Sequence, residues 1–462
     1  MIESKKLFAV IFSILFIGIA IVVPSSARAD GLADGAASPE LAGTADVGRG
    51  ALGQWSVFGQ FTFVSQYHPS YHAAYRGQNS LDSKSGNRET ADVTLSLGHR
   101  LWRGAEFWAY PEIDQGFGFN NTLGIAGFSS GEAYKVGKNQ PYLRLPRLFV
   151  RQVIDLAGGQ QQVDAVAGQM GGNLSANNVT FTVGKFSVVD LFDNNSYAHD
   201  PRTDFLNWSV IDAGPFDYAA DAWGFTNGAA AEWNQNAWTL RGGFFQLSKV
   251  PNGKVTGFHF HGHSFIGELE HRHQWLDHPG KVKLMAFNNR GDMASYKDAV
   301  QLGLLTGTTP DVSLVRRYSS NTGYAINFEQ ELIGGLGAFA RAAMNGGKKE
   351  AYEFTEINRS VSAGLSLKGN RWQRPNDKLG VAGVVNSLSG DARAYFAAGG
   401  LGILIGDGQL NYAKEKIAEA YYSIQVMTGA SVTVDFQRVV NPAYNRDRGP
   451  VPIYAVRFHA EF

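Results

Sequence analysis

Apolar and polar residues alternate one by one along much of this chain. Between residues 90 and 97 every odd position is apolar and every even position is polar, and the same period of two recurs at 179–183, 360–367, 421–426 and 432–437. Neighbouring side chains of a β-strand point to opposite faces, so each stretch predicts a strand with one apolar and one polar face. Few helical patterns separate these stretches, and we therefore expect an all-β fold.

A soluble β-sandwich would show the same alternation with its apolar face inside, but two further features favour a barrel whose apolar face meets lipid. Aromatic residues gather where the expected strands end, which is typical of the girdles at a membrane surface. They are Trp102, Trp108, Tyr110, Trp233 and Trp238. The last stretch, residues 454–462, alternates up to its final Phe and resembles the C-terminal assembly signal of bacterial outer-membrane barrels. We expect a transmembrane antiparallel barrel in outer-membrane lipid, assembled by the barrel-assembly machinery through this last strand.

The length of the chain sets the size of such a barrel. A spanning strand takes about 9–11 residues, and single-chain barrels have an even number of strands. With turns and loops included, about 25–30 residues per strand predict about 14–18 strands. Barrels of that size leave an aqueous channel, whereas eight-stranded barrels are filled by their own side chains.

The first 29 residues have the composition of a secretion signal. Two lysines precede the apolar stretch Leu7–Val23, Pro24 ends it, and the small residues within 27–29 suit a cleavage site. The apolar stretch is also near the length that spans a bilayer, so an uncleaved anchor is the alternative. We expect residues 1–29 to act as a signal peptide for export.

The rest of the chain divides into a short segment and one large domain. Residues 30–54 are rich in Gly, Ala and Asp and predict a flexible segment too short for a plug domain, and residues 55–462 form the expected barrel. The 41 basic and 41 acidic side chains cancel, which argues against a nucleic-acid partner. The absence of cysteine excludes a disulfide scaffold and a cysteine zinc site.

A set of stretches from about residue 90 to the C-terminus is similar to one known protein family. The strongest matches are 184–195 and 197–208, and the others are 110–112, 116–118, 123–128, 144–152, 217–224, 267–270, 279–284 and 439–442. They resemble the carbohydrate-selective porin family of OprB-type outer-membrane porins, and their order and spacing carry the resemblance more than any single match. The resemblance implies a sixteen-stranded barrel with loops folded inward, and passive uptake of small sugars across the outer membrane of a Gram-negative bacterium.

The phase of the alternation indicates which side chains face the channel. If the odd residues of 91–97 face lipid, their even neighbours face inward, and the next two stretches can be phased in the same way. A single β-bulge would invert this phase. The inward candidates of the first three stretches are Asp92, Arg100, Glu106, Trp108, Glu112, Arg147 and Arg151.

We expect the pore constriction to be built by Arg100, Glu112, Arg147 and Arg151, with Trp108 as a stacking platform for a sugar ring. Arginine offers five fixed donors that suit neighbouring sugar hydroxyls, and a carboxylate accepts from hydroxyls. The alternative is a network of arginines and carboxylates that only satisfies the charges of the lumen. Further lumen candidates are Asp92, Glu106, Glu268, Glu270, Lys281, Lys283 and Arg457.

Two other features stand outside the strand pattern. Asp200–Pro201 has the form of a helix start, which predicts a short helix over Asp200–Asp212 in an inward loop, with an external loop as the alternative. His259, His261 and His263 share one strand face and could bind a metal, although such spacing also occurs in loops. We expect no metal site and no cofactor.

The functional prediction is a porin that admits sugars by facilitated diffusion. One alternative is a general or anion-selective porin, which is favoured if arginines dominate the channel wall. Another is a barrel enzyme such as a lipid hydrolase, which needs a Ser/His pair on the lipid face. We find no such pair and no other catalytic motif in the sequence, and we expect no catalytic residue. The sequence leaves the sugar and the oligomeric state open.

Overall fold

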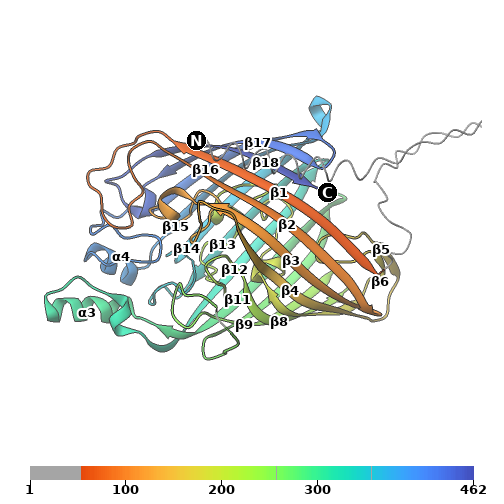
Figure 1. Cartoon of the computed structure of the whole chain (residues 1–462), viewed down its shortest axis with the longest axis horizontal. Coiled ribbons are helices and arrows are strands. Elements are labelled where there is room, and N and C mark those ends of the chain that lie inside the picture. Colours follow the sequence, from red (N-terminus) through yellow and green to blue (C-terminus); the bar gives the residue numbers. More distant parts are fainter. Residues whose placement is uncertain (1–53, 256, 355) are drawn as a thin grey trace, which may run out of the picture. The chain divides into compact units, whose positions relative to one another are not determined.

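The computed structural model describes residues 54–462 except residues 256 and 355. In this part of the chain, sixteen antiparallel strands close into one barrel, which confirms the strand number implied by the resemblance (Figure 1). The strands are β1 (Trp55–His68), β2 (Gly86–Trp102), β3 (Ala105–Gly116), β4 (Tyr142–Asp155), β7 (Asn178–Phe186), β8 (Thr226–Gln235), β9 (Trp238–Gln246), β10 (His263–Trp275), β11 (His278–Met293), β12 (Arg317–Ile333), β13 (Leu336–Asn345), β14 (Arg359–Gly369), β15 (Arg374–Ser387), β16 (Glu415–Met427), β17 (Ala430–Val440) and β18 (Val451–Glu461). The expected signal peptide and nearly all of the expected flexible segment lie outside the described residues.

The two ends of the barrel differ in the length of their connections. At one end, the turn end, most strands are joined by two to four residues, and Gly335 and Gly429 supply the positive φ that tight hairpins need. The exception is the connection 156–177, which contains the two-stranded sheet β5 (Gln160–Val163) and β6 (Gly172–Ser175).

At the other end, the loop end, the connections are long and carry the described helices (Figure 1). The helices are α2 (Trp208–Ile211), α3 (Tyr296–Thr306) and α4 (Gly390–Ala397). Within the described residues, none of the helices has the length and apolar character needed to cross a membrane.

The barrel closes where the first strand meets the last. β1 pairs with β18 in a register that runs from Gln60 opposite Glu461 to Tyr67 opposite Tyr454. The ring of the C-terminal Phe462 lies against Gly59, where any side chain would collide with it. Closure pairs the main-chain groups of every wall strand, which a barrel in lipid requires.

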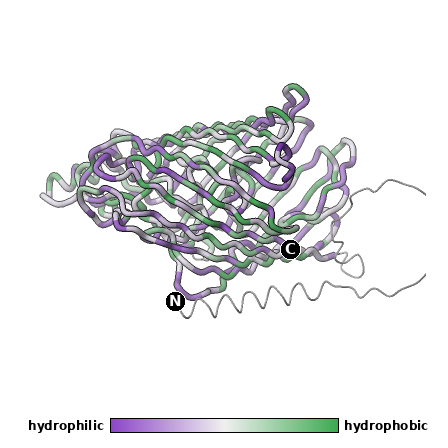
Figure 2. The backbone as a smooth tube through the Cα atoms, turned by 90° about the horizontal axis from the view of Figure 1, so that it is seen from above, coloured by the Kyte–Doolittle hydropathy of each residue, from purple (hydrophilic) through white to green (hydrophobic). Residues whose placement is uncertain are grey.

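The wall has an apolar outer face and a polar inner face, as the alternation predicts. Phe181, Val183 and Leu240 are exposed on the outside, while their neighbours Thr180 and Thr182 are buried. Hydrophobic and hydrophilic positions alternate along the strands in Figure 2. This arrangement suits a wall between lipid and a polar interior.

Five half-exposed tryptophans form a girdle at the turn end: Trp55, Trp102, Trp233, Trp238 and Trp275. This confirms the predicted placement of aromatic residues at strand ends for three of the five residues named from the sequence. The other two, Trp108 and Tyr110, point inward and are buried, so their assignment to the girdle was wrong.

The connection between β7 and β8, residues 187–225, folds into the barrel, and we call it the inner loop. Three wall glutamates accept hydrogen bonds from its main-chain N–H groups: Glu268 from Asp193 (2.8 Å), Glu329 from Ser196 (2.7 Å) and Glu419 from Leu206 (2.5 Å). Two wall arginines donate to its carbonyl groups: Arg341 to Ala198 (2.8 Å) and Val210 (2.9 Å), and Arg457 to Pro201 (2.6 Å) and Asp204 (2.8 Å). The polar inner face of the wall is therefore used to hold a loop.

A second inward loop, residues 117–141, is held in the same way. The carboxylate of Glu415 accepts hydrogen bonds from the main-chain N–H groups of Ala126 (3.0 Å) and Gly127 (2.7 Å). This loop also bonds to the inner loop, because the N–H of Gly131 donates to the carbonyl of Leu206 at 2.7 Å. The two loops form one body inside the barrel, which confirms the expectation of inward-folded loops.

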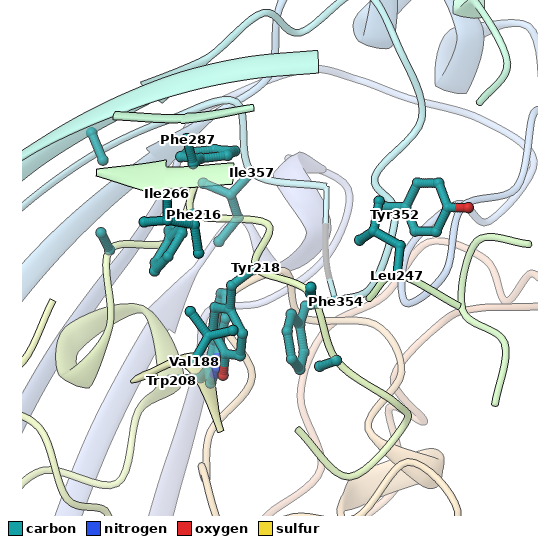
Figure 3. Packing of buried hydrophobic residues seen from close by; sticks show 14 of the residues in the cluster. Val188, Trp208, Phe216, Tyr218, Leu247, Ile266, Phe287, Tyr352, Phe354 and Ile357 are labelled. Atoms are coloured by element: carbon teal, nitrogen blue, oxygen red, sulfur yellow. The ribbon is translucent and has the colours of Figure 1, made fainter. Parts of the chain in front are cut away.

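Apolar side chains of the inner loop add a hydrophobic core inside the barrel (Figure 3). The ring of Phe216 lies 5.1 Å from that of Phe287 on the wall, measured between centroids. The ring of Tyr218 lies 4.4 Å from that of Phe354 in the connection 346–358. Burial of such aromatic groups stabilises the loop in its inward position.

The predicted helix over Asp200–Asp212 was wrong in extent. Only Trp208–Ile211 is helical, and Asn207 caps it by accepting a hydrogen bond from the N–H of Ser209 at 3.1 Å. The preceding main chain is bound by wall residues instead, since Arg457 takes two of its carbonyl groups and Glu419 takes its N–H groups. One turn at the start keeps a helical bond, from the N–H of Asp204 to the carbonyl of Asp200 at 2.8 Å, and beyond it the bonds to the wall take the place of helical ones.

Replacing Arg341 with Met is expected to release the inner loop. The Arg341 and Asp193 side chains are buried and paired at 3.1 Å, so the change leaves a buried carboxylate unpaired and lowers the free energy of unfolding by about 3–5 kcal/mol. The measurements are the midpoint of heat-induced loss of the folded band on a gel, and cleavage of residues 187–225 by chymotrypsin. Arg438→Met, at an exposed position of β17, is the control. Equal cleavage of both variants would contradict the loop-holding role.

Candidate functional site

Two cavities lie inside the barrel and share part of their lining. The larger, of about 1260 Å³, reaches turn-end residues such as Asn236 and Glu461. The smaller, of about 200 Å³, lies among the inward loops beside Tyr134 and Trp208. Six residues line both cavities, and we call them the eyelet residues: Gln60, Arg147, Asp190, His199, Asp200 and Arg202. A solute that moves from one cavity to the other contacts this set.

The charged eyelet residues form two arginine–aspartate pairs. Arg147 donates through Nε and Nη2 to both oxygens of Asp190, at 2.8 and 2.7 Å. Arg202 donates in the same two-pronged way to Asp200, at 2.8 Å for each bond. The side chains stay accessible, at 26% for Arg202 and 32% for Asp200. Two cations and two anions thus face the passage in fixed orientations.

The first pair is rigid because of its surroundings. The Arg147 guanidinium lies over the rings of Tyr110 and Phe225, 5.4 and 4.8 Å from their centroids. Asp190 ends a short 3-10 helix, Val188–Asp190, and its carboxylate accepts a hydrogen bond from the N–H of Ser187 at 3.0 Å.

Titratable groups of the inner loop differ in their protonation. Burial raises the pKa of Asp200, but the Arg202 guanidinium outweighs it and holds that pKa well below its ordinary range. Burial, helped by Arg341, lowers the pKa of His199. Burial and the nearby Asp193 carboxylate raise the pKa of Asp212 to about 8, although Arg341 opposes them. At neutral pH, His199 is therefore neutral and Asp212 is mostly protonated.

This arrangement suits a neutral solute with many hydroxyl groups. Guanidinium N–H groups donate, carboxylate oxygens accept, and a sugar hydroxyl can do both. The paired charges already satisfy each other, so contact with a solute exchanges hydrogen bonds without leaving an isolated charge.

The predicted constriction residues are spread over several places. Arg147 lies at the eyelet, Arg151 lines only the larger cavity, and Glu112 lines only the smaller one, as does the further lumen candidate Asp92. Arg100 lies opposite Glu106 in the pairing of β2 with β3. Glu106 precedes Glu112 by six residues, which is about 20 Å along a strand. Arg100 and Glu112 therefore do not share one constriction.

Trp108 faces inward, as its strand phase predicts, but it cannot serve as a stacking platform in this structure. Its side chain is 0% exposed. The indole Nε1 donates to Glu106 at 3.1 Å, and the ring stacks on Phe58 at 6.4 Å between centroids. Neighbouring side chains occupy the faces that a sugar would need.

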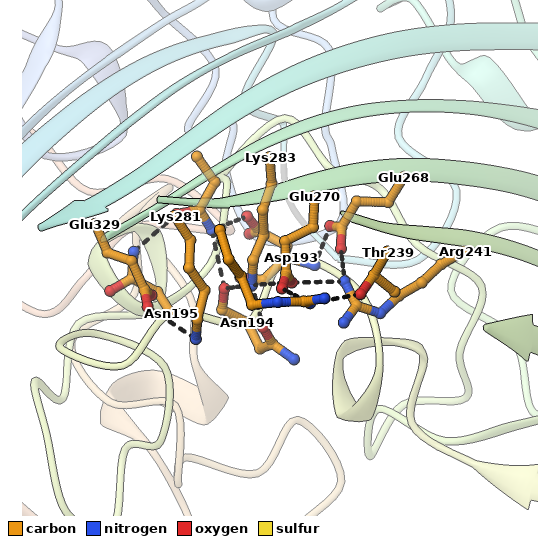
Figure 4. A network of polar contacts seen from close by, with 12 residues as sticks. Asp193, Asn194, Asn195, Thr239, Arg241, Glu268, Glu270, Lys281, Lys283 and Glu329 are labelled. Atoms are coloured by element: carbon orange, nitrogen blue, oxygen red, sulfur yellow. Dashed lines mark hydrogen bonds and ion pairs between the residues drawn. The ribbon is translucent and has the colours of Figure 1, made fainter. Parts of the chain in front are cut away.

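The further lumen candidates Glu268, Glu270 and Lys283 are buried under the inner loop (Figure 4). Arg241 donates to both glutamates, at 2.8 and 2.9 Å, and Lys283 donates to Asn194 of the inner loop. For these residues the structure fits the alternative of a charge-satisfying network. Lys281 and Arg457 also contact the inner loop or the wall residue Glu329.

Sequence phase missed Arg144 because of a β-bulge. Tyr110 pairs with Arg147, but Glu112 pairs with Arg144, so β4 carries one extra residue between the two pairs. Both arginines therefore face inward although they are three residues apart, and Arg144 forms ion pairs with Glu112 and Asp114.

The eyelet residues that the sequence reasoning missed lie mostly on the inner loop. Asp190, His199, Asp200 and Arg202 have no strand period to reveal their direction. They do fall within 184–208, the stretch with the strongest family resemblance. Gln60 is on β1, whose phase the alternation of its neighbours could have revealed.

The three histidines do not converge on one point. His263 contacts the carbonyl of Phe260 at 3.0 Å, and His261 lies 3.3 Å from Asp292. Over the described ranges, no group of three or more His, Cys, Asp or Glu side chains is arranged to hold a metal ion.

A closed sixteen-stranded barrel with an apolar outer belt and a charged inner passage defines the class of outer-membrane porins. Residues 78–462 match the carbohydrate-selective porin, OprB family, and the chain belongs to that family. The expected resemblance is thereby confirmed, and the protein is a carbohydrate-selective porin whose permeants are sugars and whose outer face meets membrane lipid.

Solved structures match this chain at low sequence identity, and the first of them shares its fold. The high-pH structure of Pseudomonas putida OprB has a TM-score of 0.67 and 16% identity, covering 88% of this chain and 94% of that chain. The low-pH structure of the same protein has a TM-score of 0.47 and 13% identity, over 88% and 93%. The channel DcaP of Acinetobacter baumannii has a TM-score of 0.49 and 10% identity, over 88% and 97%. No curated protein sequence gives a match.

Removing the charge of Arg147 and removing the charge of Asp190, in two separate variants, are expected to shift the ion selectivity in opposite directions. Arg147→Gln leaves a net negative eyelet and favours cations, while Asp190→Asn favours anions. A unit charge about 4 Å from an ion in water is worth about 1 kcal/mol, so the permeability ratio should change up to about fivefold. The reversal potential in a salt gradient measures this, and shifts of the same sign in both variants would contradict the assignment.

Raising the pH from 7 to 9 is expected to make the channel more cation-selective. Asp212 lines the smaller cavity, and with a pKa of about 8 it loses its proton over this interval and adds a negative charge. The Asp212→Asn variant should lose this response, as followed by the reversal potential at each pH. A response of full size in that variant would assign it to another group.

Proposed function

We propose that this porin lets neutral sugars diffuse passively into the periplasm and that the eyelet residues are their main contact. The observation that carries the proposal is the pair of arginine–aspartate bridges lining both cavities. Such bridges offer donors and acceptors at fixed positions. They also favour weak, exchangeable contacts, which a channel needs for release.

The balance of charge favours this function over a general or anion-selective porin. Two arginines face two aspartates at the eyelet, and on the loop-end side the single guanidinium of Arg144 faces the two carboxylates of Glu112 and Asp114. Equal numbers of fixed charges at the eyelet give little net attraction to ions of either sign, and these pairs contain no excess of arginine that would favour anions. A neutral polyol can still bind both partners.

We further propose that the turn end faces the periplasm. Outer-membrane barrels have short periplasmic turns and longer extracellular loops, and the tryptophan girdle at the turn end suits a membrane interface. Export by residues 1–29 and assembly through β18 belong to the same proposal. The last strand pairs with β1, so its docking completes the barrel.

We also propose that the chain acts as a channel and not as an enzyme. The four charged eyelet side chains pair with one another as arginine–carboxylate bridges, which suits contact with a passing solute.

The test is block of single-channel current by sugars. Glucose is expected to reduce the current in a saturable way, with weaker block by larger oligosaccharides. Hydrogen bonds to charged groups are worth about 1.5–3 kcal/mol, so Arg202→Gln should raise the half-blocking concentration about tenfold or more. Arg438→Gln is the matched control, because Arg438 lines neither cavity.

Block that rises linearly with sugar concentration, or that is equal in both variants, would contradict eyelet binding. Liposome swelling with the same sugars separates block from permeation, because a sugar that blocks without entering produces no swelling.

A further inference from the structure

The connection 156–177 is much longer than the other connections at the turn end. Other described turns at this end have two to four residues, whereas this one is long enough to form the sheet β5–β6. The two strands extend the chain, and residues 164–171 form the tip between them. We call these residues, together with Val163 at the end of β5, the turn-end tip (residues 163–171).

The turn-end tip reaches into the barrel. Met170 is buried in the same hydrophobic cluster as Trp108, Tyr110 and Phe149 of the wall. An added side chain at Gly168 would lie 3.2 Å from the Tyr110 hydroxyl. Tyr110 in turn lies under the Arg147 guanidinium of the eyelet. The tip therefore ends just beyond the eyelet, on its turn-end side.

Three side chains of the wall hold the tip in place. Glu106 accepts a hydrogen bond from the N–H of Met170 at 3.2 Å, and Arg100 donates to the carbonyl of Gly171 at 3.0 Å. Arg151 reaches the side-chain oxygen of Gln169 at 3.4 Å. The sequence analysis expected these three wall residues to line the channel or its constriction, and they instead anchor a third inward segment. This segment enters the barrel from the turn end, whereas the inner loop and the loop 117–141 enter from the loop end.

The tip presents small, uncharged groups to the larger cavity. Its lining residues are Val163, Ala165, Val166, Ala167, Gly168 and Gln169. Polar wall residues such as Asn178, Asn234 and Arg272 line other parts of the same cavity. The tip occupies space next to the eyelet without adding charge, so its main effect on a neutral solute is steric.

We propose that the turn-end tip is a second, size-selecting element of the pore, placed on the exit side of the eyelet. The eyelet binds hydroxyl groups, and the tip limits the size of the sugar that can leave toward the turn end. This inference rests on the proposed passage of sugars through the eyelet. It assigns to Arg100, Glu106 and Arg151 the positioning of the tip.

The direct test is to remove the tip. Asp155 of β4 pairs with Asn178 of β7, so residues 156–177 can be replaced by a two-residue Asn-Gly turn, which has the length of the turns in the neighbouring hairpins. The expected result is a single-channel conductance about twofold higher or more, because conduction follows pore width. Liposomes should also admit trisaccharides at a rate closer to that of glucose.

Glucose block of the current separates the two proposals. If block persists in the deletion variant while conductance and size dependence match the parent, the eyelet role stands and the tip role is overturned. If the parent shows no glucose block, the proposed function of the eyelet fails, whatever the deletion does.

A single-residue variant covers the case in which the deletion does not fold. The chain contains no cysteine, so Ala167→Cys introduces one thiol at the cavity lining. A thiol reagent with a bulky neutral group, added from the turn-end side, should lower conductance and slow glucose entry. Ala157→Cys is the control, because Ala157 is exposed in the same connection but lines neither cavity. Full labelling of Ala167→Cys with unchanged conductance would overturn the proposal.

Discussion

Buried charges on the inner face of the wall must find partners, and in this barrel they find them on the main chain of the inner loop. Glu419 accepts from loop N–H groups, and Arg341 donates to loop carbonyls. Hydrogen bonds to charged groups are worth about 1.5–3 kcal/mol each, and a buried charge without a partner is costly. The wall and the loop therefore depend on each other.

This pairing determines which charges remain available to a solute. Wall residues such as Glu268 and Lys283 are covered by the loop, while the bridges Arg147–Asp190 and Arg202–Asp200 stay partly exposed. The whole chain has equal numbers of basic and acidic residues, and the eyelet has two of each. The balance of charge at the eyelet explains a channel for neutral sugars more directly than the net charge of the whole chain does.

Much of the wall could be predicted from the sequence, and little of its interior. Alternation gave the inward direction of Asp92, Arg147 and Glu268, because a strand has a period of two. It failed at Arg144, where a bulge shifts the phase. Alternation also could not show that Phe58 and Glu106 enclose Trp108, because contacts between different strands leave no period in the sequence. It could not place Asp200 and Arg202 at the eyelet either, because the direction of a loop has no period.

The pairing of wall charges with loop main chain is tested most directly by amide hydrogen exchange in the folded porin. The N–H groups of Asp193, Ser196, Leu206 and Asn207 all donate to buried carboxylates. We expect these groups to exchange as slowly as amides of the barrel strands. Exchange as fast as that of the exposed amides in the connection 294–316 would contradict it.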